Sequence, residues 1–407
     1  PSKCTKIEHY LGSNYACIAS IGHLRNINGL KSIDTKKTFQ PTYSFIQEKV
    51  EHINNMQKII DNFDKNNILI ASDDDREGES IAWHICEIFN LPVDTTHRII
   101  FHEITKPAII NAVNNPTTIN MKLVKAQQAR QVLDIIVGYK ISPYLWTYLF
   151  NDKENSLSAG RCQTPTLKLV YENYLENINN NINFNYKIKG YFTSKNLLFD
   201  LNHEFNSTDE ITKFLELSKT FNHTISIETP KTIDKLPPKP FHTSLLLQTV
   251  NNQLHYSPKD TMNLCQQLYQ NGYITYMRTE SNKYSKIFID KTEDYINTHY
   301  NKKYIGNNSQ LINENSANPH EAIRVTQIEV TNISSENSRL STLYKLIWKN
   351  TIESCMANAV YQNTNIKLSA PNKYKYSNTL ETPIFLGWKI INNKNISEIN
   401  EQNKNAS

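Results

Sequence analysis

Tyr276 and Arg278 lie two residues apart in a run of β-favouring residues that follows the turn-forming pair Asn271-Gly272. If this run is extended, side chains at positions i and i+2 point to the same side, so the phenol and the guanidinium would lie together. A phenol has a pKa of about 10 and is a weak nucleophile, and a nearby cation helps it to attack a phosphodiester. The guanidinium can also bind a phosphate through two hydrogen bonds. The same pattern fits a structural tyrosine, because the chain has 22 tyrosines.

An acidic cluster is the second candidate for chemistry. It begins at Asp73, directly after the apolar run 68–71, and precedes a segment with helical spacing of apolar residues. The apolar run is typical of a buried parallel strand, and ligands bind where such strands end. Asp73, Asp75 and Glu77 offer hard oxygen ligands, so the cluster predicts a Mg²⁺ site. The alternative is a set of caps for the following helix, which would account for one or two of these acids.

Two further segments combine a basic residue with a backbone that could approach a phosphate. Small residues and Arg161 form the loop 158–165, which opens a helix, and helix N-termini bind phosphate. His320 and Arg324 follow a loop rich in Asn and Ser, where either could hold a phosphate. Taken alone, the pattern of the loop 158–165 is only moderately specific.

The periodicities of the first half predict the elements that position these residues. Residues 6–11 have helical spacing, 15–20 are typical of a short strand, and 56–63 form an amphipathic helix. Apolar residues over 123–137 mark one long helix, which the pair Ser142-Pro143 is expected to end.

The second half alternates strands and helices around a proline-rich segment. Residues 183–204 alternate apolar and polar side chains, which predicts a hairpin or meander. The proline-rich stretch 229–240 is expected to be a stiff connector and a domain boundary. Helices near 243–255 and 259–270 lead to the Tyr276 segment, which gives the order helix, turn, helix and strand of a winged-helix unit.

Length and composition bound the answer. A chain of 407 residues exceeds one usual core, so two to four domains are expected. A net charge of +5 permits a polyanionic partner without requiring one. The six cysteines are scattered and form no CxxC pair, which predicts a reduced, intracellular protein. No apolar run approaches about 20 residues, so no membrane span or signal peptide is expected.

Four motifs in this order resemble those of the type IA DNA topoisomerases. Residues 73–79 resemble the acidic motif of the Toprim domain, and 158–161 resemble the DNA-gripping loop of the family. Residues 274–279 resemble its nucleophile motif, and 320–324 its later phosphate-binding motif.

The resemblance extends over nearly the whole chain, to about residue 390. Residues 12–25 and 125–146 are also similar to the family. Met277 is more similar to the bacterial topoisomerase I branch than to the topoisomerase III branch, which usually has proline there.

The resemblance implies a multidomain fold with α/β and α+β parts. A Toprim α/β domain, helical and winged-helix-like domains and β arch domains would form a torus. The expected domains are Toprim over 1–115 with its first strand missing (26–55 being a candidate part of the gate), a helical DNA-binding gate over 116–175, the first β arch part over 176–240, the winged-helix-like domain with the tyrosine over 241–355, the returning arch strands over 356–392, and a polar, disordered tail over 393–407.

The activity that the resemblance implies is ATP-independent relaxation of negatively supercoiled DNA. Tyr276 would attack one strand to form a 5′-phosphotyrosine and free a 3′-hydroxyl, and the strand would be rejoined after strand passage. Asp73, Asp75 and Glu77 would hold Mg²⁺, and Arg278 would stabilise the charge of the transition state. The expected partner is single-stranded or negatively supercoiled DNA, with no nucleotide cofactor, and the protein is expected to be a cytoplasmic, nucleoid-associated monomer.

Further site residues follow from the same resemblance. Lys3 and Glu77 would lie near the scissile phosphate, while Arg161 and His320 would position the strand. Trp146 and Tyr139 offer faces for stacking on bases. The expected DNA contacts are His23, Arg130, Gln131, Asp134, Tyr139, Trp146, Ser158, Ala159, Gly160, Arg161, Cys162, Gln163, Arg278 and Arg324.

The chain departs from the family pattern in several places. The first strand of the family ends in a glutamate before the Ser-Pro that precedes the position of Lys3, and this chain starts at Pro1. We therefore expect a piece truncated at both ends, without the remaining gate segments or zinc ribbons, that is inactive alone. Glu280 stands where aspartate is usual, and Gln131 replaces a frequent arginine.

Other classes of protein remain open. Another Toprim enzyme, such as a nuclease or a primase, would lack the tyrosine nucleophile. A catalytically incomplete fragment that binds single-stranded DNA is the second alternative. A reverse gyrase would need a helicase half, and the chain has no GxxxxGK[ST] pattern.

Overall fold

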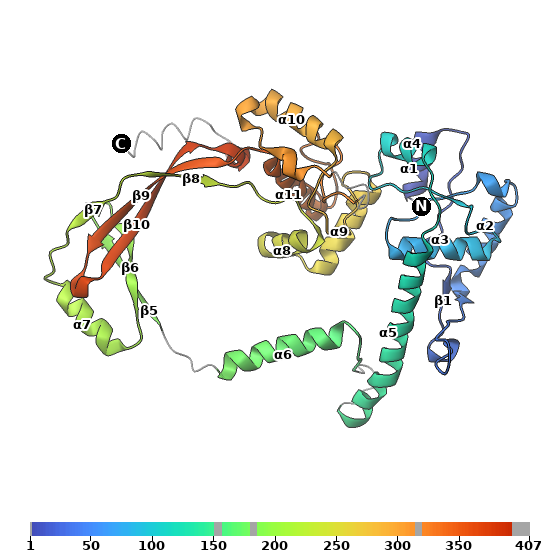
Figure 1. Ribbon diagram of the computed structural model, residues 1–407, viewed down its shortest axis with the longest axis horizontal. Coiled ribbons are helices and arrows are strands. Elements are labelled where there is room, and N and C mark those ends of the chain that lie inside the picture. The colour runs from blue at the N-terminus through green and yellow to red at the C-terminus, as the bar shows by residue number, and fades with distance from the viewer. Residues whose placement is uncertain (1, 150–156, 180–184, 314–319, 393–407) are drawn as a thin grey trace. The chain divides into compact units, whose positions relative to one another are not determined.

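The computed structural model describes residues 2–149, 157–179, 185–313 and 320–392. The chain forms two compact units, and the path crosses between them three times (Figure 1). The first unit contains Pro1–Asn177 and Leu247–Thr279, and the second contains Ile178–Leu246 and Glu280–Ser407. In the part of the chain that the structure describes, no helix has the length and apolar character needed to span a membrane.

The first unit is built around a short parallel strand pair. Strand β3 (Leu69–Ile70) pairs in parallel with β4 (His97–Arg98), as the sequence predicts for the apolar run. Five residues separate β3 from helix α3 (Arg76–Ile88), which buries Ala82 and Cys86. Its other elements are α1 (Ser2–Leu11), β1 (Arg25–Asn26) paired with β2 (Ser44–Phe45), α2 (Val50–Ile60), α4 (Lys106–Asn114), α5 (Met121–Tyr148), α6 (Gln163–Asn179, which ends at the unit border), the larger part of α8 (Thr243–Leu254), and α9 (Pro258–Gln270).

Two predictions for this unit are wrong. Residues 15–20 form no strand, and the N–H of Cys17 donates instead to the side chain of Glu8 (Oε1) at 2.7 Å. Helix α5 does not end at Ser142-Pro143 but continues to Tyr148. A proline removes one backbone donor, and a helix of 28 residues can lose one hydrogen bond without ending. Ser142 is buried at this point, where its Oγ accepts a hydrogen bond from Ala159 N at 3.0 Å.

The helix pair before Tyr276 is confirmed as α8 and α9, but the strand after it is not. Gly272 ends the turn after α9 with a φ of +70°, which glycine adopts without strain. Residues 275–279 then run in an irregular conformation rather than a regular strand. Tyr276 N donates to His102 O at 2.8 Å, which holds this segment beside residues that follow β4.

The second unit contains an antiparallel sheet of six strands. Their order is β5-β6-β10-β9-β7, and β8 also pairs with β9. The predicted hairpin and the returning strands are confirmed in this sheet. Its elements are β5 (Tyr186–Phe192), β6 (Leu197–Phe205), α7 (Thr208–Ser218), β7 (Ile225–Ile227), β8 (Lys231–Lys235), α10 (Lys286–Tyr300), α11 (Ser338–Ser354), β9 (Ala359–Ser369) and β10 (Lys375–Phe385).

The expected connector over 229–240 is partly wrong, because its centre is strand β8. The prolines lie on either side of Lys231–Lys235, so every residue of the strand keeps its N–H. Phe199, Phe205 and Phe214 pack under the sheet as its core. The predicted tail over 393–407 lies outside the described residues.

Candidate active site

A tight loop between β3 and α3 brings the acidic cluster together. Asp75 has extended backbone angles and caps α3, with its Oδ1 accepting from Gly78 N at 2.7 Å. A Cβ on Gly78 would lie 1.9 Å from the carbonyl oxygen of Asp73, so only glycine allows this close turn. The cap interpretation is therefore confirmed for Asp75, whose other carboxylate oxygen faces Tyr276, and the Mg²⁺ site stays a prediction.

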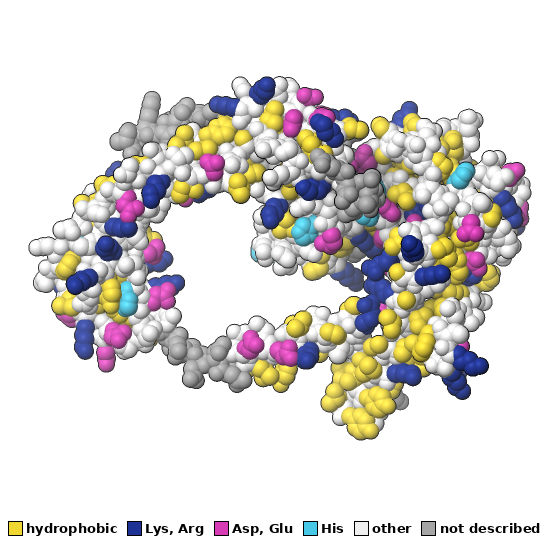
Figure 2. All heavy atoms as spheres, viewed as in Figure 1, with side chains coloured by type: hydrophobic (Ala, Val, Ile, Leu, Met, Phe, Trp, Pro, Cys, Tyr) yellow, Lys and Arg dark blue, Asp and Glu magenta, His cyan; other side chains and the backbone are white. Residues whose placement is uncertain are grey.

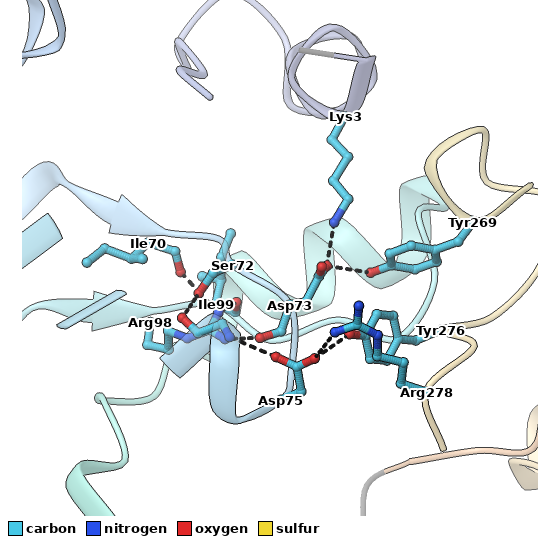
Figure 3. Close-up of polar contacts among 11 residues, drawn as sticks. Lys3, Ile70, Ser72, Asp73, Asp75, Arg98, Ile99, Tyr269, Tyr276 and Arg278 are labelled. Carbon is cyan, nitrogen blue, oxygen red and sulfur yellow. Dashed lines mark hydrogen bonds and ion pairs between the residues drawn. The ribbon is translucent and has the colours of Figure 1, made fainter. Parts of the chain in front are cut away.

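Tyr276 is buried, and its hydroxyl donates to Asp75 Oδ2 at 2.6 Å (Figure 3). Burial raises the pKa of the Tyr276 phenol well above its ordinary value, and the charges of Asp73 and Asp75 raise it further. The phenol is therefore protonated at neutral pH, and its proton already points to a carboxylate.

Arg278 meets the same carboxylate from the solvent side. Its Nη1 lies 3.2 Å from Asp75 Oδ2 and 3.2 Å from Glu77 Oε2, and half of its side chain is exposed. Burial by itself would raise the pKa of Asp75, but hydrogen bonds from Tyr276 and Gly78 and the charge of Arg278 bring it below its ordinary value. Although the strand is absent, the tyrosine and the arginine converge on one oxygen as the i, i+2 spacing predicts.

Lys3 reaches the cluster from α1. Its ammonium group forms an ion pair with Asp73 Oδ1, and Figure 3 shows the side chain pointing from the helix to that carboxylate. The structure therefore brings together five of the predicted residues, which come from α1, the loop after β3, the first turn of α3 and the segment after α9. Together with Arg278, which comes from the same segment as Tyr276, these are six residues: Lys3, Asp73, Asp75, Glu77, Tyr276 and Arg278.

A buried ion pair, which the sequence patterns did not indicate, supports the loop from the side of β4. Arg98 is fully buried and donates to Glu79 Oε1 at 3.2 Å and to the carbonyl oxygen of Asp73 at 2.8 Å. Glu79 in turn accepts from Asn120 N at 3.0 Å, just before α5. An arginine after a polar turn resembles a surface residue, so only the packing of β4 against α3 could identify this role.

The predicted DNA contacts of α5 and the following loop form a second group. Arg161 Nε donates to Asp134 Oδ1 at 2.9 Å, and Arg130 Nε lies 3.8 Å from Asp134 Oδ2. Gln163 Nε2 donates to Ser158 O at 2.9 Å and holds the small-residue loop closed. The two arginines thus share one carboxylate and remain partly exposed.

Aromatic side chains continue along α5. Tyr139 is 59% exposed, and Trp146 Nε1 donates to the carbonyl oxygen of Leu157. Figure 2 shows apolar side chains gathered over the lower end of this helix, where Tyr144 and Tyr148 stack and are exposed.

The remaining predicted residues come from several parts of the chain. His23 contacts His84 ring to ring at 6.2 Å, and His84 Nδ1 accepts from Arg25 Nε at 3.0 Å. Cys162 is exposed, and Ala159 is buried. His320 and Arg324 belong to the second unit, where Arg324 is buried and its Nε donates to Glu321 Oε2 at 2.6 Å.

Comparison with known proteins places this geometry in a family. A model of the Toprim domain matches residues 1–104, and a model of the DNA topoisomerase family matches residues 118–406. DNA topoisomerase 1 of Thermotoga maritima is 35% identical, covering 96% of this chain and 63% of that protein. DNA topoisomerase 1 of Buchnera aphidicola is 33% identical, covering 97% of this chain and 50% of that protein.

A solved structure agrees with these sequence matches. The full-length topoisomerase I of Thermotoga maritima superposes with a TM-score of 0.81 at 33% identity, covering 96% of this chain and 66% of that one. The fold is therefore that of a multidomain α/β protein with a Toprim domain. The chain belongs to the type IA DNA topoisomerase family, and it spans between half and two thirds of the length of the relatives it matches.

The Toprim domain is a metal-binding fold, and the donors in this loop fit a divalent ion. Asp73, Asp75 and Glu77 offer carboxylate oxygens, which hard cations prefer. Each acid already faces a cationic side chain, Lys3 or Arg278.

Proposed function

We propose that this chain carries the cleavage centre of a type IA DNA topoisomerase, which breaks and rejoins one DNA strand through Tyr276. The observation that supports this most is the 2.6 Å hydrogen bond from the Tyr276 hydroxyl to Asp75, with Arg278 on the same oxygen. A buried phenol with a carboxylate as proton acceptor and a cation beside it has the parts of an activated nucleophile.

In the proposed reaction, Tyr276 Oη attacks a backbone phosphorus and its proton passes to Asp75. The bond from phosphorus to the 3′-oxygen breaks, and that oxygen leaves as a hydroxyl after taking a proton, for which Lys3 is the candidate donor. Arg278 offsets the negative charge that develops on the phosphate. The phosphotyrosine ester keeps the energy of the broken bond, so the returning 3′-hydroxyl rejoins the strand without ATP.

Asp73, Asp75 and Glu77 are the residues that would hold Mg²⁺, which supplies positive charge next to the phosphate when bound. We further propose single-stranded segments of negatively supercoiled DNA as the substrate. Arg130, Arg161 and the exposed aromatic residues of α5 would contact the strand through charge and stacking. We also propose a cytoplasmic, nucleoid-associated location, where the protein would reach chromosomal DNA.

Covalent capture tests the proposal. The complete gene product is incubated with Mg²⁺ and an oligonucleotide carrying a 3′ label, so that the label stays with the 5′-phosphotyrosine fragment, and adducts are counted after denaturation. Tyr276→Phe should form none while binding the oligonucleotide with nearly unchanged affinity. Tyr273→Phe is the matched control, because it removes a hydroxyl three residues away and should keep the adduct. An adduct in Tyr276→Phe would contradict the assignment.

A further inference from the structure

Tyr269 lies in the last turn of α9 and is fully buried beside the candidate nucleophile. Its carbonyl oxygen accepts from Gly272 N at 2.8 Å, so this residue also closes the turn that leads to Tyr276. Nothing in the sequence singles it out among the 22 tyrosines.

The side chain of Tyr269 contacts three residues of the site. Its hydroxyl donates to Asp73 Oδ1 at 3.5 Å, the same oxygen that Lys3 contacts. The Lys3 ammonium lies over its ring, 4.8 Å from the ring centre. Its ring also meets the ring of Tyr276 at 5.2 Å and 64°, an edge-to-face arrangement. Figure 3 shows Tyr269 between Lys3 above and Tyr276 below.

These contacts join parts of the chain that are far apart in sequence. Lys3 comes from α1, Asp73 from the loop after β3, and Tyr276 from the irregular segment after α9. The irregular segment is attached through Tyr276 N, which donates to His102 O at 2.8 Å. The contacts of the rigid Tyr269 ring with the Tyr276 ring and the Lys3 ammonium can set the places of both groups.

We infer that Tyr269 is a positioning residue, whose ring holds the Tyr276 phenol and the Lys3 ammonium at their places around Asp73. The inference rests on the proposed function for its consequence in catalysis. The ring carries the role, and the long hydroxyl contact to Asp73 adds little to it.

The first test separates rate from binding in the complete gene product. Tyr269→Leu removes the ring, and we expect single-turnover cleavage at saturating oligonucleotide to fall by up to about 10²-fold, because small misplacements of reacting groups have effects of that size. The dissociation constant for the oligonucleotide should stay nearly unchanged. Tyr269→Phe keeps the ring and should restore most of the rate.

Tyr344→Leu is the matched control for loss of a buried tyrosine. Tyr344 is 1% exposed in α11 of the second unit, and its hydroxyl donates to Val330 O at 2.6 Å. This variant should lose thermal stability as Tyr269→Leu does but keep the cleavage rate of its folded fraction. Equal rates for Tyr269→Leu and the wild type, or equal losses in Tyr269→Phe and Tyr269→Leu, would overturn the inference.

A second readout does not depend on activity. In protein labelled with 3-fluorotyrosine, the ¹⁹F resonance that is missing in Tyr276→Phe belongs to Tyr276. This resonance should shift in Tyr269→Leu and stay in place in Tyr344→Leu. If the wild type formed no adduct but the resonance shifted, the proposed function would fail and the positioning role would stand. An adduct with no response of rate or resonance to Tyr269→Leu would reject the positioning role alone.

Discussion

Asp75 has two oxygens with different partners, and this division explains how one short acidic run can serve structure and chemistry together. Oδ1 accepts from Gly78 N and caps α3, while Oδ2 accepts from Tyr276 and Arg278. The cap fixes the direction of the carboxylate, so the second oxygen, Oδ2, points at the phenol. Removal of either contact would therefore change the other.

Arg278→Lys tests whether the full guanidinium of the arginine is needed. Its Nη1 alone contacts both Asp75 and Glu77, which a lysine ammonium could also do, but a lysine cannot bind a phosphate through two parallel hydrogen bonds. We expect single-turnover cleavage to fall by about 10²–10³-fold, the usual effect of losing one preorganised donor, with little change in folding stability. Wild-type cleavage rates in Arg278→Lys would show that charge alone is sufficient.

At the scale of elements, the loop between β3 and α3 fixes the positions of Asp73 and Asp75. Arg98, in β4, donates to the carbonyl oxygen of Asp73. Gly78 lets the first turn of α3 pack directly against the same carbonyl. Both residues act on the backbone of Asp73 rather than on substrate. The loop is therefore set by buried contacts, while the side chains it presents remain partly exposed.

Gly78→Ala should disrupt the loop between β3 and α3. The new methyl group would overlap the backbone of Asp73, so we expect a loss of about 2–4 kcal/mol in the free energy of unfolding, measured by chemical denaturation. Gly138→Ala in α5 is the control, because its Cβ would be 3.9 Å from the nearest atom, Ala159 O. That change should be neutral or stabilise by up to about 1 kcal/mol. Equal effects at the two sites would contradict the account of the loop.

At the scale of the whole molecule, each unit contains a buried ionisable side chain whose pKa is shifted toward the neutral form, a histidine in the first unit and a glutamate in the second. In the first unit, burial lowers the pKa of His84 in α3 to about 3, and the charges of Arg25 and His23 add to this effect. In the second unit, burial raises the pKa of Glu353 in α11 to about 7, although Lys349 and Asn392 act in the opposite direction. His84 must stay neutral to fold, and Glu353 is most stable when protonated.

The stabilities of the two units should therefore respond oppositely to pH. Below about pH 6.5 the unfolded chain protonates His84 and the folded chain does not, so the first unit loses stability toward pH 4.5. From pH 7 to 4.5 the folded chain protonates Glu353 before the unfolded chain does, so the second unit gains stability. Each slope should not exceed about 1.4 kcal/mol per pH unit, the value for one proton.

Hydrogen exchange of peptides from α3 and α11, corrected for intrinsic rates, measures the two responses separately. His84→Gln should flatten the first response, and Glu353→Gln should flatten the second. Parallel changes in the two peptides, or no effect of these variants, would contradict the prediction.

Local patterns in the sequence predict the candidate chemistry and much of the local structure. Residue types and spacing identify the acidic loop, the Tyr276–Arg278 pair, the α8–α9 pair and the returning strands, because periodicity and turn chemistry are local properties. Tertiary partners decided three other features instead. These are the path of the chain past Pro143, the strand β8 between prolines, and the irregular Tyr276 segment. The roles of Tyr269 and Arg98 were also decided by tertiary structure, since the role of a buried side chain depends on which distant segments pack around it. Long-range packing therefore selects which groups meet at Asp73 and Asp75, because these groups come from segments that are distant in the sequence.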